Sequence, residues 1–472
     1  MTDLQISFHG AAGTVTGSRH LLTAGATRVL LDAGLFQGLK ELRQRNWGDP
    51  GFDAASLDHV VLSHTHIDHV GYLPRLAPRC PVHCTPAAYE LTRLMLLDAA
   101  KIQEEDAARA NRKGYSKHRP ALPLFTTEDA RAALELRRKE RYGAWFGLGD
   151  GVRARFHNAG HILGSAFVEL RVSRGGGEVG IVFSGDLGRY GAPLHRDPDP
   201  LPEHDLLIVE ATYGDRLHSR QPIDEQVTEP VGRTLEEGGT VLVPAFAVGR
   251  SQVVSLLLRR LMDEGAIPEA PIHLDSPMAV EATAIYDRFL DGRNVDDEHF
   301  ADGRQRLLPP QVELHDTVAD SKRLNSLPGP RVVISASGML TGGRVLHHLR
   351  RLAPDPRNLL LLVGYQPAGT RGRALLDGAR ELKAYGSQFP VRCRVLSVDG
   401  LSGHADRDEL LRWVGTAPRP PAVACVVHGE GPALRSMARH LAERYGTLAL
   451  VPSLGETVDV PALLDRAAQR PA

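Results

Sequence analysis

Short, uninterrupted apolar runs that each end in a polar loop recur along this chain. The loops are rich in Gly, Ser, Thr, His and Asp. Continuous apolar runs are typical of strands that helices cover on both faces. Polar residues at the ends of such strands indicate one shared active-site rim. The pattern predicts an α/β protein. The runs are residues 29–31, 60–62, 181–183, 207–209, 241–243, 332–334 and 424–427.

The pattern of predicted strands and helices changes twice along the chain. From about residue 212 to 390, strands alternate with helices, for example 241–246 before 250–262. This βαβ pattern predicts a domain with its own parallel sheet. The first and last parts of the chain resemble each other more than either resembles the middle part. We therefore expect domain parts at 1–211, 212–390 and 391–472. We also expect helices over 86–112 and 128–141.

Composition restricts the partners and the compartment. The 472 residues carry a net charge of −1, so any site for a polyanion must be local. The four cysteines lack zinc-ribbon spacing and predict reduced thiols. We find no signal-peptide pattern at Met1 and no apolar run long enough to span a membrane. We therefore expect a cytoplasmic protein that does not engage membranes.

Four potential metal ligands lie within six positions directly after one apolar run: His64, His66, Asp68 and His69. They can converge where the chain leaves a sheet in a tight loop. A solvated histidine-rich loop is the alternative, but it does not explain why His161 and Asp186 also follow predicted strands. This mixture of imidazole and carboxylate suits Zn²⁺ or Mn²⁺ better than Ca²⁺. The ligands suffice for two metals bridged by one carboxylate.

These motifs resemble, in their order, those of the metallo-β-lactamase fold, a four-layered αβ/βα sandwich. Asp32 resembles that fold's first motif, a buried carboxylate that supports the ligands. Glu210, His404 and His428 resemble the three further motifs of the β-CASP nucleases, a group that includes the pre-mRNA 3′-end cleavage endonuclease and its bacterial relatives. Segments 244–250 and 335–340 resemble parts of that family's inserted domain. The resemblance implies a sandwich interrupted by an inserted β-CASP domain with a parallel sheet.

The resemblance also implies a role for each motif. One Zn²⁺ would be held by His64, His66, His161 and Asp186, and a second by Asp68, His69, Asp186 and His428, with Mn²⁺ as the alternative metal. A hydroxide between the metals would be the nucleophile, and Asp68 counts among the catalytic residues. His404 would protonate the leaving 3′-oxygen as general acid, oriented by Glu210. The RNA-cleaving members carry a histidine at the position of His428, which favours RNA over DNA.

Two strand-to-helix junctions are candidates for binding the phosphates of RNA: Arg250, and the stretch that contains Ser337, Gly338 and Arg344. Exposed N–H groups at helix starts favour anions. For the neighbouring Gly342 and Gly343, a role in packing is an equal alternative.

The leading hypothesis is a zinc-dependent ribonuclease that hydrolyses phosphodiester bonds of single-stranded RNA in RNA processing or decay. One alternative keeps the fold but gives it a small-molecule substrate, such as a thioester or lactam. Another is a non-catalytic RNA-binding scaffold. Both endo- and exonuclease action are compatible with these residues, and so is a homodimer.

Overall fold

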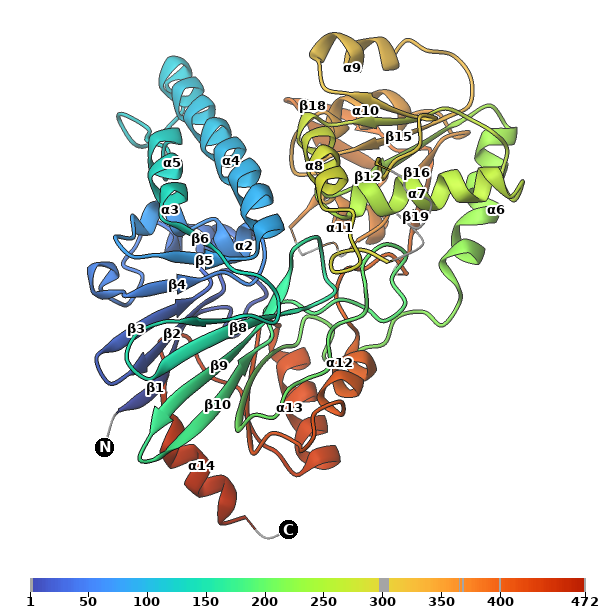
Figure 1. The fold of residues 1–472 in the computed structure, drawn as a ribbon. Helices are drawn as coiled ribbons and strands as arrows, with labels where there is room; N and C mark the ends of the chain where they lie inside the picture. The colour runs from blue at the N-terminus through green and yellow to red at the C-terminus, as the bar shows by residue number, and fades with distance from the viewer. Residues whose placement is uncertain (1–2, 297–304, 365, 367–368, 399, 471–472) are drawn as a thin grey trace. The chain divides into compact units, whose positions relative to one another are not determined.

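The computed structural model describes residues 3–296, 305–364, 366, 369–398 and 400–470. The chain forms two units (Figure 1). Unit 1 comprises residues 1–190, 196–217 and 404–472, and unit 2 comprises 191–195 and 218–403. One unit therefore interrupts the sequence of the other. The predicted divisions at 211/212 and 390/391 stay predictions.

Unit 1 contains two seven-stranded sheets. The first runs in the order β22-β1-β2-β3-β4-β5-β6, and the second in the order β21-β20-β11-β10-β9-β8-β7. The strands of the first sheet are β1 (Leu4–Gly10), β2 (Arg19–Ala24), β3 (Thr27–Leu31), β4 (His59–Val61), β5 (Val82–Cys84), β6 (Arg137–Lys139) and β22 (Thr457–Asp459). Those of the second are β7 (Trp145–Gly147), β8 (Val152–Asn158), β9 (Ala166–Arg174), β10 (Gly177–Phe183), β11 (Leu206–Glu210), β20 (Val423–Val427) and β21 (Leu448–Leu450).

The two sheets pack face to face through a common apolar core, to which Ile6 and Val29 contribute from one sheet and Phe156 and Val168 from the other. Helices cover the outer face of each sheet. The unit therefore has four layers, helix–sheet–sheet–helix, and the predicted sandwich is confirmed. The helices of unit 1 are α1 (Lys40–Arg45), the 3₁₀ turn η1 (Ala54–Ser56), α2 (Ile67–Val70), α3 (Leu73–Leu76), α4 (Pro86–Lys113), α5 (Thr127–Glu135), α12 (Arg407–Val414), α13 (Gly431–Tyr445) and α14 (Val460–Ala468).

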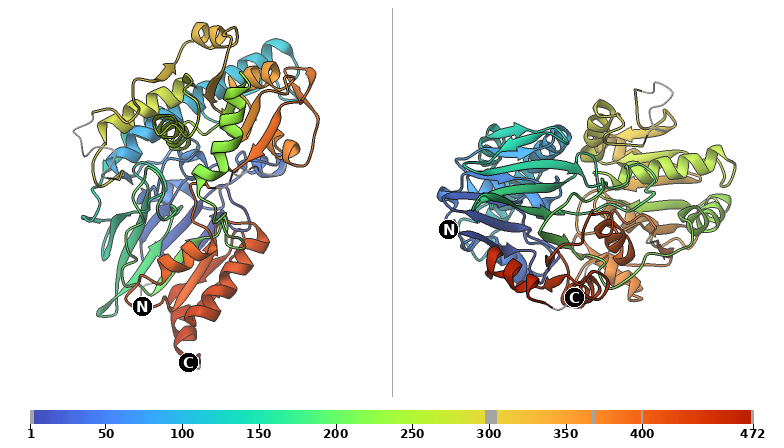
Figure 2. Two further views of the ribbon diagram at one scale, coloured as in Figure 1. Left: turned by 90° about the vertical axis from the view of Figure 1, so that its right-hand side faces the viewer. Right: turned by 60° about the horizontal axis from the view of Figure 1, so that its bottom comes forward.

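The outer layers are held by two further cores. One joins α2–α5 to the first sheet. The other joins α12 and α13, drawn in orange-red, to the second sheet (Figures 1 and 2). It includes the fully buried Trp413. Burial of these large apolar side chains is the main stabilising contribution to such a sandwich.

Unit 2 is built on a six-stranded sheet in the order β14-β13-β15-β12-β16-β19, whose strand pairs are all parallel. This confirms the predicted parallel sheet of the inserted domain. Its strands are β12 (Thr240–Pro244), β13 (Ile272–Asp275), β14 (Val312–His315), β15 (Arg331–Ser335), β16 (Leu359–Leu362) and β19 (Arg394–Ser397), beside a hairpin of β17 (Glu381–Ala384) and β18 (Ser387–Pro390). Its helices are α6 (Ile223–Glu236), α7 (Arg250–Asp263), α8 (Pro277–Arg288), α9 (Val318–Leu324), α10 (Val345–Leu352) and α11 (Arg371–Leu376).

The predicted helix over 86–112 is confirmed as α4, which begins with Thr85 as N-cap and ends at the left-handed Gly114. The predicted helix over 128–141 is correct only in its first half. It ends at Glu135, and residues 137–139 form β6 instead. The cause is tertiary, because these residues pair in parallel with β5. No helix of the described residues is long and apolar enough to cross a membrane.

Glu169 is a buried carboxylate on β9 that binds three basic side chains. Its oxygens lie 2.6 Å from Arg155, 2.8 Å from His157 and 2.8 Å from Arg171. Burial alone would raise the pKa of Glu169, but these partners outweigh burial and lower the pKa to about 2. The interaction therefore stabilises the fold at neutral pH.

We expect Glu169→Gln to lower the free energy of unfolding at pH 7 by about 2–3 kcal/mol, because the basic partners lose a buried counter-charge. A depressed pKa contributes stability above the usual glutamate value of 4.5, and this contribution is lost as the pH falls towards about 2. The difference between the two proteins in urea denaturation should shrink over that interval. Glu178→Gln removes an exposed pair with Arg153 and should change stability by less than about 0.5 kcal/mol. Equal effects of the two substitutions would contradict the role of burial.

Candidate metal centre and general-acid site

The loop after β4 is held in place by Asp32, at the end of β3. The Asp32 carboxylate accepts hydrogen bonds from the Ser63 N–H (2.8 Å) and the Ser63 hydroxyl (3.0 Å). It also lies 2.7 Å from Nδ1 of His69. A proton on that nitrogen leaves Nε2 of His69 with its lone pair, which is the form that binds a metal. Asp32 thus contacts both Ser63 and His69, and its role as a support for metal ligands stays a prediction.

The loop backbone is fixed by the ends of β2 and β3. The Ser18 N–H donates to the Asp68 carbonyl (2.8 Å), and the Ala33 N–H donates to the His69 carbonyl (2.7 Å). Gly34 is required here, because a Cβ at this position would lie 1.6 Å from the Asp68 carbonyl oxygen. Asp68 and His69 lie in the short helix α2, and His64 and His66 precede it. This break between loop and helix lets the four side chains point in different directions.

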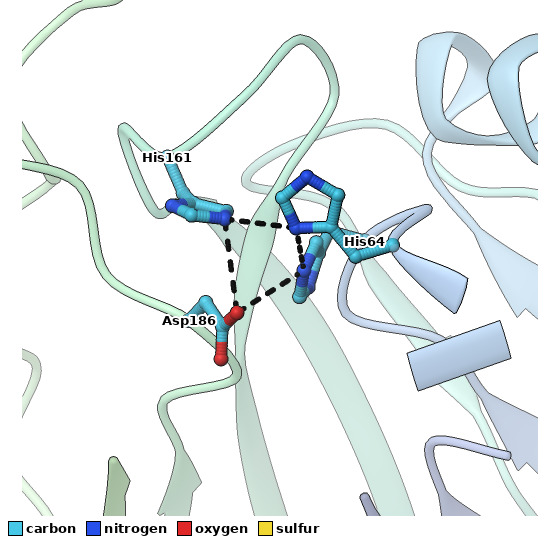
Figure 3. Close-up of side chains that lie close together, drawn as sticks. His64, His161 and Asp186 are labelled. Carbon is cyan, nitrogen blue, oxygen red and sulfur yellow. Dashed lines mark hydrogen bonds and ion pairs between the residues drawn. The ribbon is translucent and has the colours of Figure 1, made fainter. Parts of the chain in front are cut away.

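A first cluster contains His64, His66, His161 and Asp186. Nδ1 of His66 lies 3.0 Å from Nε2 of His64 and 3.1 Å from Nε2 of His161. Oδ2 of Asp186 lies 3.4 Å from Nε2 of His64 and 3.7 Å from Nε2 of His161. Figure 3 shows the side chains of His64, His161 and Asp186 pointing toward one another. The loops that carry His161 and Asp186 touch backbone to backbone at Gly188, where a Cβ would lie 1.9 Å from the Gly160 carbonyl oxygen.

A second cluster contains Asp68, His69 and His428. Nε2 of His428 lies 3.1 Å from Nε2 of His69 and 3.8 Å from Oδ2 of Asp68. Asp186 belongs to both clusters, since its second oxygen, Oδ1, lies 3.3 Å from Nε2 of His69 and 3.5 Å from Nδ1 of His428. The seven predicted ligands therefore lie together in unit 1.

These donors fit metal ions. Two ligands at 2.0–2.1 Å from a tetrahedral zinc ion are about 3.3 Å apart, close to the separations within both clusters. Oδ1 of Asp186 is buried and accepts no hydrogen bond from any described residue, although buried carboxylate oxygens are normally bonded. Burial also lowers the pKa of His64 and of His66 well below the usual value, which favours the neutral imidazole that binds metals.

His404 and Glu210 form a pair beside Asp186. Nδ1 of His404 lies 3.3 Å from both carboxylate oxygens of Glu210, and 3.8 Å from Oδ2 of Asp186. Burial lowers the pKa of His404, but the charges of Glu210 and Asp186 outweigh burial and raise the pKa to about 9. The loop is positioned by the Ala405 N–H, which donates to the Leu187 carbonyl (2.9 Å). A capping box between Asp406 and Glu409 then begins α12.

Thr212 was missed by the sequence analysis. Its hydroxyl donates to Oε2 of Glu210 (2.6 Å) and lies 3.1 Å from Nδ1 of His428. It therefore links the His404–Glu210 pair to the second cluster. Its position two residues after Glu210, at the end of β11, is the signal that could have identified it.

The four predicted phosphate-binding residues lie in unit 2, apart in the sequence from the metal ligands. The Arg344 guanidinium donates to Asp275 (2.7 Å) and to the Asp316 carbonyl (2.6 Å). The guanidinium of Arg250 donates to the Val363 carbonyl. The Ser337 hydroxyl accepts from the Thr341 N–H (3.1 Å), and the Gly338 carbonyl accepts from Gln366 (3.1 Å). The two arginines thus have intramolecular partners, and a phosphate role for all four residues stays a prediction.

Three family models match this chain. They are the metallo-beta-lactamase superfamily at residues 15–229, the Beta-Casp domain at 251–375 and the Zn-dependent metallo-hydrolase RNA specificity domain at 388–452. The fold, the donor clusters and these matches define a metal-dependent hydrolase. The chain belongs to the β-CASP family of metallo-β-lactamase-fold ribonucleases, which confirms the predicted resemblance.

Individual relatives match nearly the full length of this chain. Ribonuclease TTHA0252 of Thermus thermophilus is 41% identical over 96% of this chain and 99% of its own. The transcription termination factor FttA of Pyrococcus abyssi is 32% identical over 96% of this chain and 71% of its own. A crystal structure of a protein of unknown function from Enterococcus faecalis shares the fold, with a TM-score of 0.54 and 15% identity over 97% of this chain and 99% of that one.

Proposed function

We propose that this protein is a zinc-dependent ribonuclease that hydrolyses phosphodiester bonds in single-stranded RNA, with His404 as general acid. The observation that carries the proposal is the position of Asp186, whose two oxygens face histidines of both clusters and which lies beside the His404–Glu210 pair. The RNA specificity domain at residues 388–452 and the histidine at position 428 support RNA as the substrate.

The ligand sets that we propose for two Zn²⁺ ions, with Mn²⁺ as the alternative, are those predicted from the sequence. When bound, two such ions polarise the phosphodiester and activate a water molecule near neutral pH. The protein holds the donors in place through Asp32 and through the close contact of the two ligand loops at Gly188.

The remaining step is a proton transfer to the leaving 3′-oxygen, which leaves poorly as an alkoxide at neutral pH. Glu210 holds Nδ1 of His404 and stabilises the imidazolium, so Nε2 is the nitrogen that we assign as proton donor. Thr212 restrains Glu210 from its other side. Glu210 and Thr212 thus orient His404, and Glu210 favours its protonated form. Neither residue accepts the transferred proton.

Metal removal tests the function. We expect chelation to abolish cleavage of an end-labelled single-stranded RNA, and Zn²⁺ or Mn²⁺ to restore it, because the donor clusters alone supply no nucleophile at neutral pH. Mapping the labelled products also distinguishes internal cleavage from stepwise trimming. An equal rate on single-stranded DNA would contradict the preference for RNA. Faster turnover of a lactam or thioester than of RNA would favour a small-molecule hydrolase, and RNA binding without any cleavage would favour a scaffold.

The location and assembly of the protein are also proposals. All four cysteines are free and buried, which supports a reducing compartment and hence the expected cytoplasmic location. The domain division at 1–211, 212–390 and 391–472 and the homodimer are kept as expectations. Size-exclusion chromatography with light scattering decides the homodimer.

A further inference from the structure

Three metal-type donors converge on one face of the parallel sheet in unit 2. Nδ1 of His273 on β13 lies 3.1 Å from Nε2 of His315 and 3.3 Å from Oε2 of Glu313, both on β14. The third separation, from Nε2 of His315 to Oε2 of Glu313, is 3.7 Å. We refer to these three residues as the β13–β14 cluster.

The register of the strands explains this convergence. His273 pairs with Glu313 in the parallel ladder, so the two side chains lie on the same face. His315 follows Glu313 by two residues and therefore also lies on that face. The strand end that carries His315 is anchored, because Arg344 donates to the carbonyls of His315 (3.2 Å) and Asp316 (2.6 Å). The backbone thus fixes the placement of all three donors.

Hydrogen bonding alone does not account for the triangle. Nδ1 of His273 faces both other donors, yet a neutral imidazole carries only one proton on one of its two nitrogens. Two ligands of a tetrahedral zinc ion are about 3.3 Å apart, which is close to the three separations here. The same pattern, with separations of 3.0 to 3.7 Å, occurs among His64, His66, His161 and Asp186.

We propose that the β13–β14 cluster binds an additional divalent transition-metal ion, with zinc as the best match to two imidazoles and one carboxylate. Such a His₂Glu set leaves a fourth position for water. The ion would join β13 to β14, which is the edge strand of this sheet among the described residues. It is separate from the centre that we propose for catalysis, because none of its three donors is among the seven proposed ligands.

An ion can reach the cluster from solvent. His273 is buried, but Glu313 is exposed and His315 is partly exposed. With an ion bound, both imidazoles would be neutral, which is the form that binds a metal.

The test is the metal content of the full-length protein after equilibration with buffered zinc and removal of free ions. We expect His315→Ala to bind one zinc fewer per chain than the wild type, and Glu313→Ala to show the same difference. Because it is a difference between two proteins, this result does not depend on how many ions the catalytic centre holds. Glu313 is exposed, so its substitution keeps the experiment decisive if His315→Ala does not fold.

A matched control is available in unit 1. His59, His83 and Glu140 are also two histidines and a glutamate in contact, but they form a chain through opposite nitrogens of His83, with separations of 3.0 Å at each step. Their donors do not converge on one point, so His59→Gln should leave the zinc content unchanged. Equal zinc content in the wild type, His315→Ala and Glu313→Ala would overturn the proposal. A loss in His59→Gln equal to that in His315→Ala would also overturn it, because the effect would then not be specific to convergent donors.

Discussion

His404→Ala is expected to lower the rate of single-stranded RNA cleavage by about 10²- to 10⁴-fold, the contribution of one general acid. The metal content should not change, because His404 is not among the seven proposed ligands. Its Nδ1 lies 3.8 Å from Oδ2 of Asp186. Cleavage rates under single-turnover conditions and metal analysis of the same preparation measure both outcomes.

A substrate with an activated leaving group separates acid catalysis from a structural effect. The aryl oxide of an aryl phosphodiester leaves without protonation by an acid. The loss of rate in His404→Ala should therefore be much smaller on that substrate than on RNA. An equal deficit on both substrates would contradict the assignment of His404. His440→Ala is the matched control, since His440 is a partly exposed histidine of α13 whose nearest acidic partner is Glu443 at 3.8 Å. It should retain wild-type rates.

Asp186→Asn is expected to lower the rate of RNA cleavage more than His404→Ala does, because the Asp186 carboxylate faces both donor clusters. The substitution keeps the size of the side chain but removes the negative charge that faces the histidines of both clusters. We expect both proposed metal ions to bind much more weakly and RNA cleavage to fall by more than about 10⁴-fold, beyond what one proton-transfer residue contributes.

Comparison with a ligand of one cluster sharpens this test. His161→Ala removes a donor from the first cluster only, so it should lower the content of one ion while the other is retained. Asp408→Asn changes an exposed aspartate of α12 and should leave metal content and rate unchanged. If Asp186→Asn lost no more metal than His161→Ala, the bridging role of Asp186 would be wrong.

The sequence predicted the part of the site that depends on strand ends. His64 and Asp186 each follow an apolar run and His161 follows a predicted strand, and the carboxyl ends of strands bring such residues to one rim. The fold class was predicted from the same apolar runs and from the alternation of strands and helices in the middle segment. Local pattern was sufficient here because each proposed ligand lies in the polar segment that follows a strand.

Features that depend on pairing between distant segments were not predicted. Residues 137–139 continue a helical pattern but become β6, since pairing with β5 determines their structure. Arg344 begins a helix after a glycine-rich turn, yet its guanidinium binds Asp275, whose position depends on the neighbouring strands. His273 and Glu313 become neighbours only through the register of β13 and β14, which no local motif records.

The position of β20 in its sheet has a consequence for the synthesis of this protein. β20 lies between β11 and β21, and His428 follows it directly. A growing chain therefore contains six of the seven proposed ligands well before it contains His404 and His428. The ribosome must add residue 428 before the proposed centre can be assembled. Through most of its synthesis, a nascent chain thus lacks a complete proposed centre.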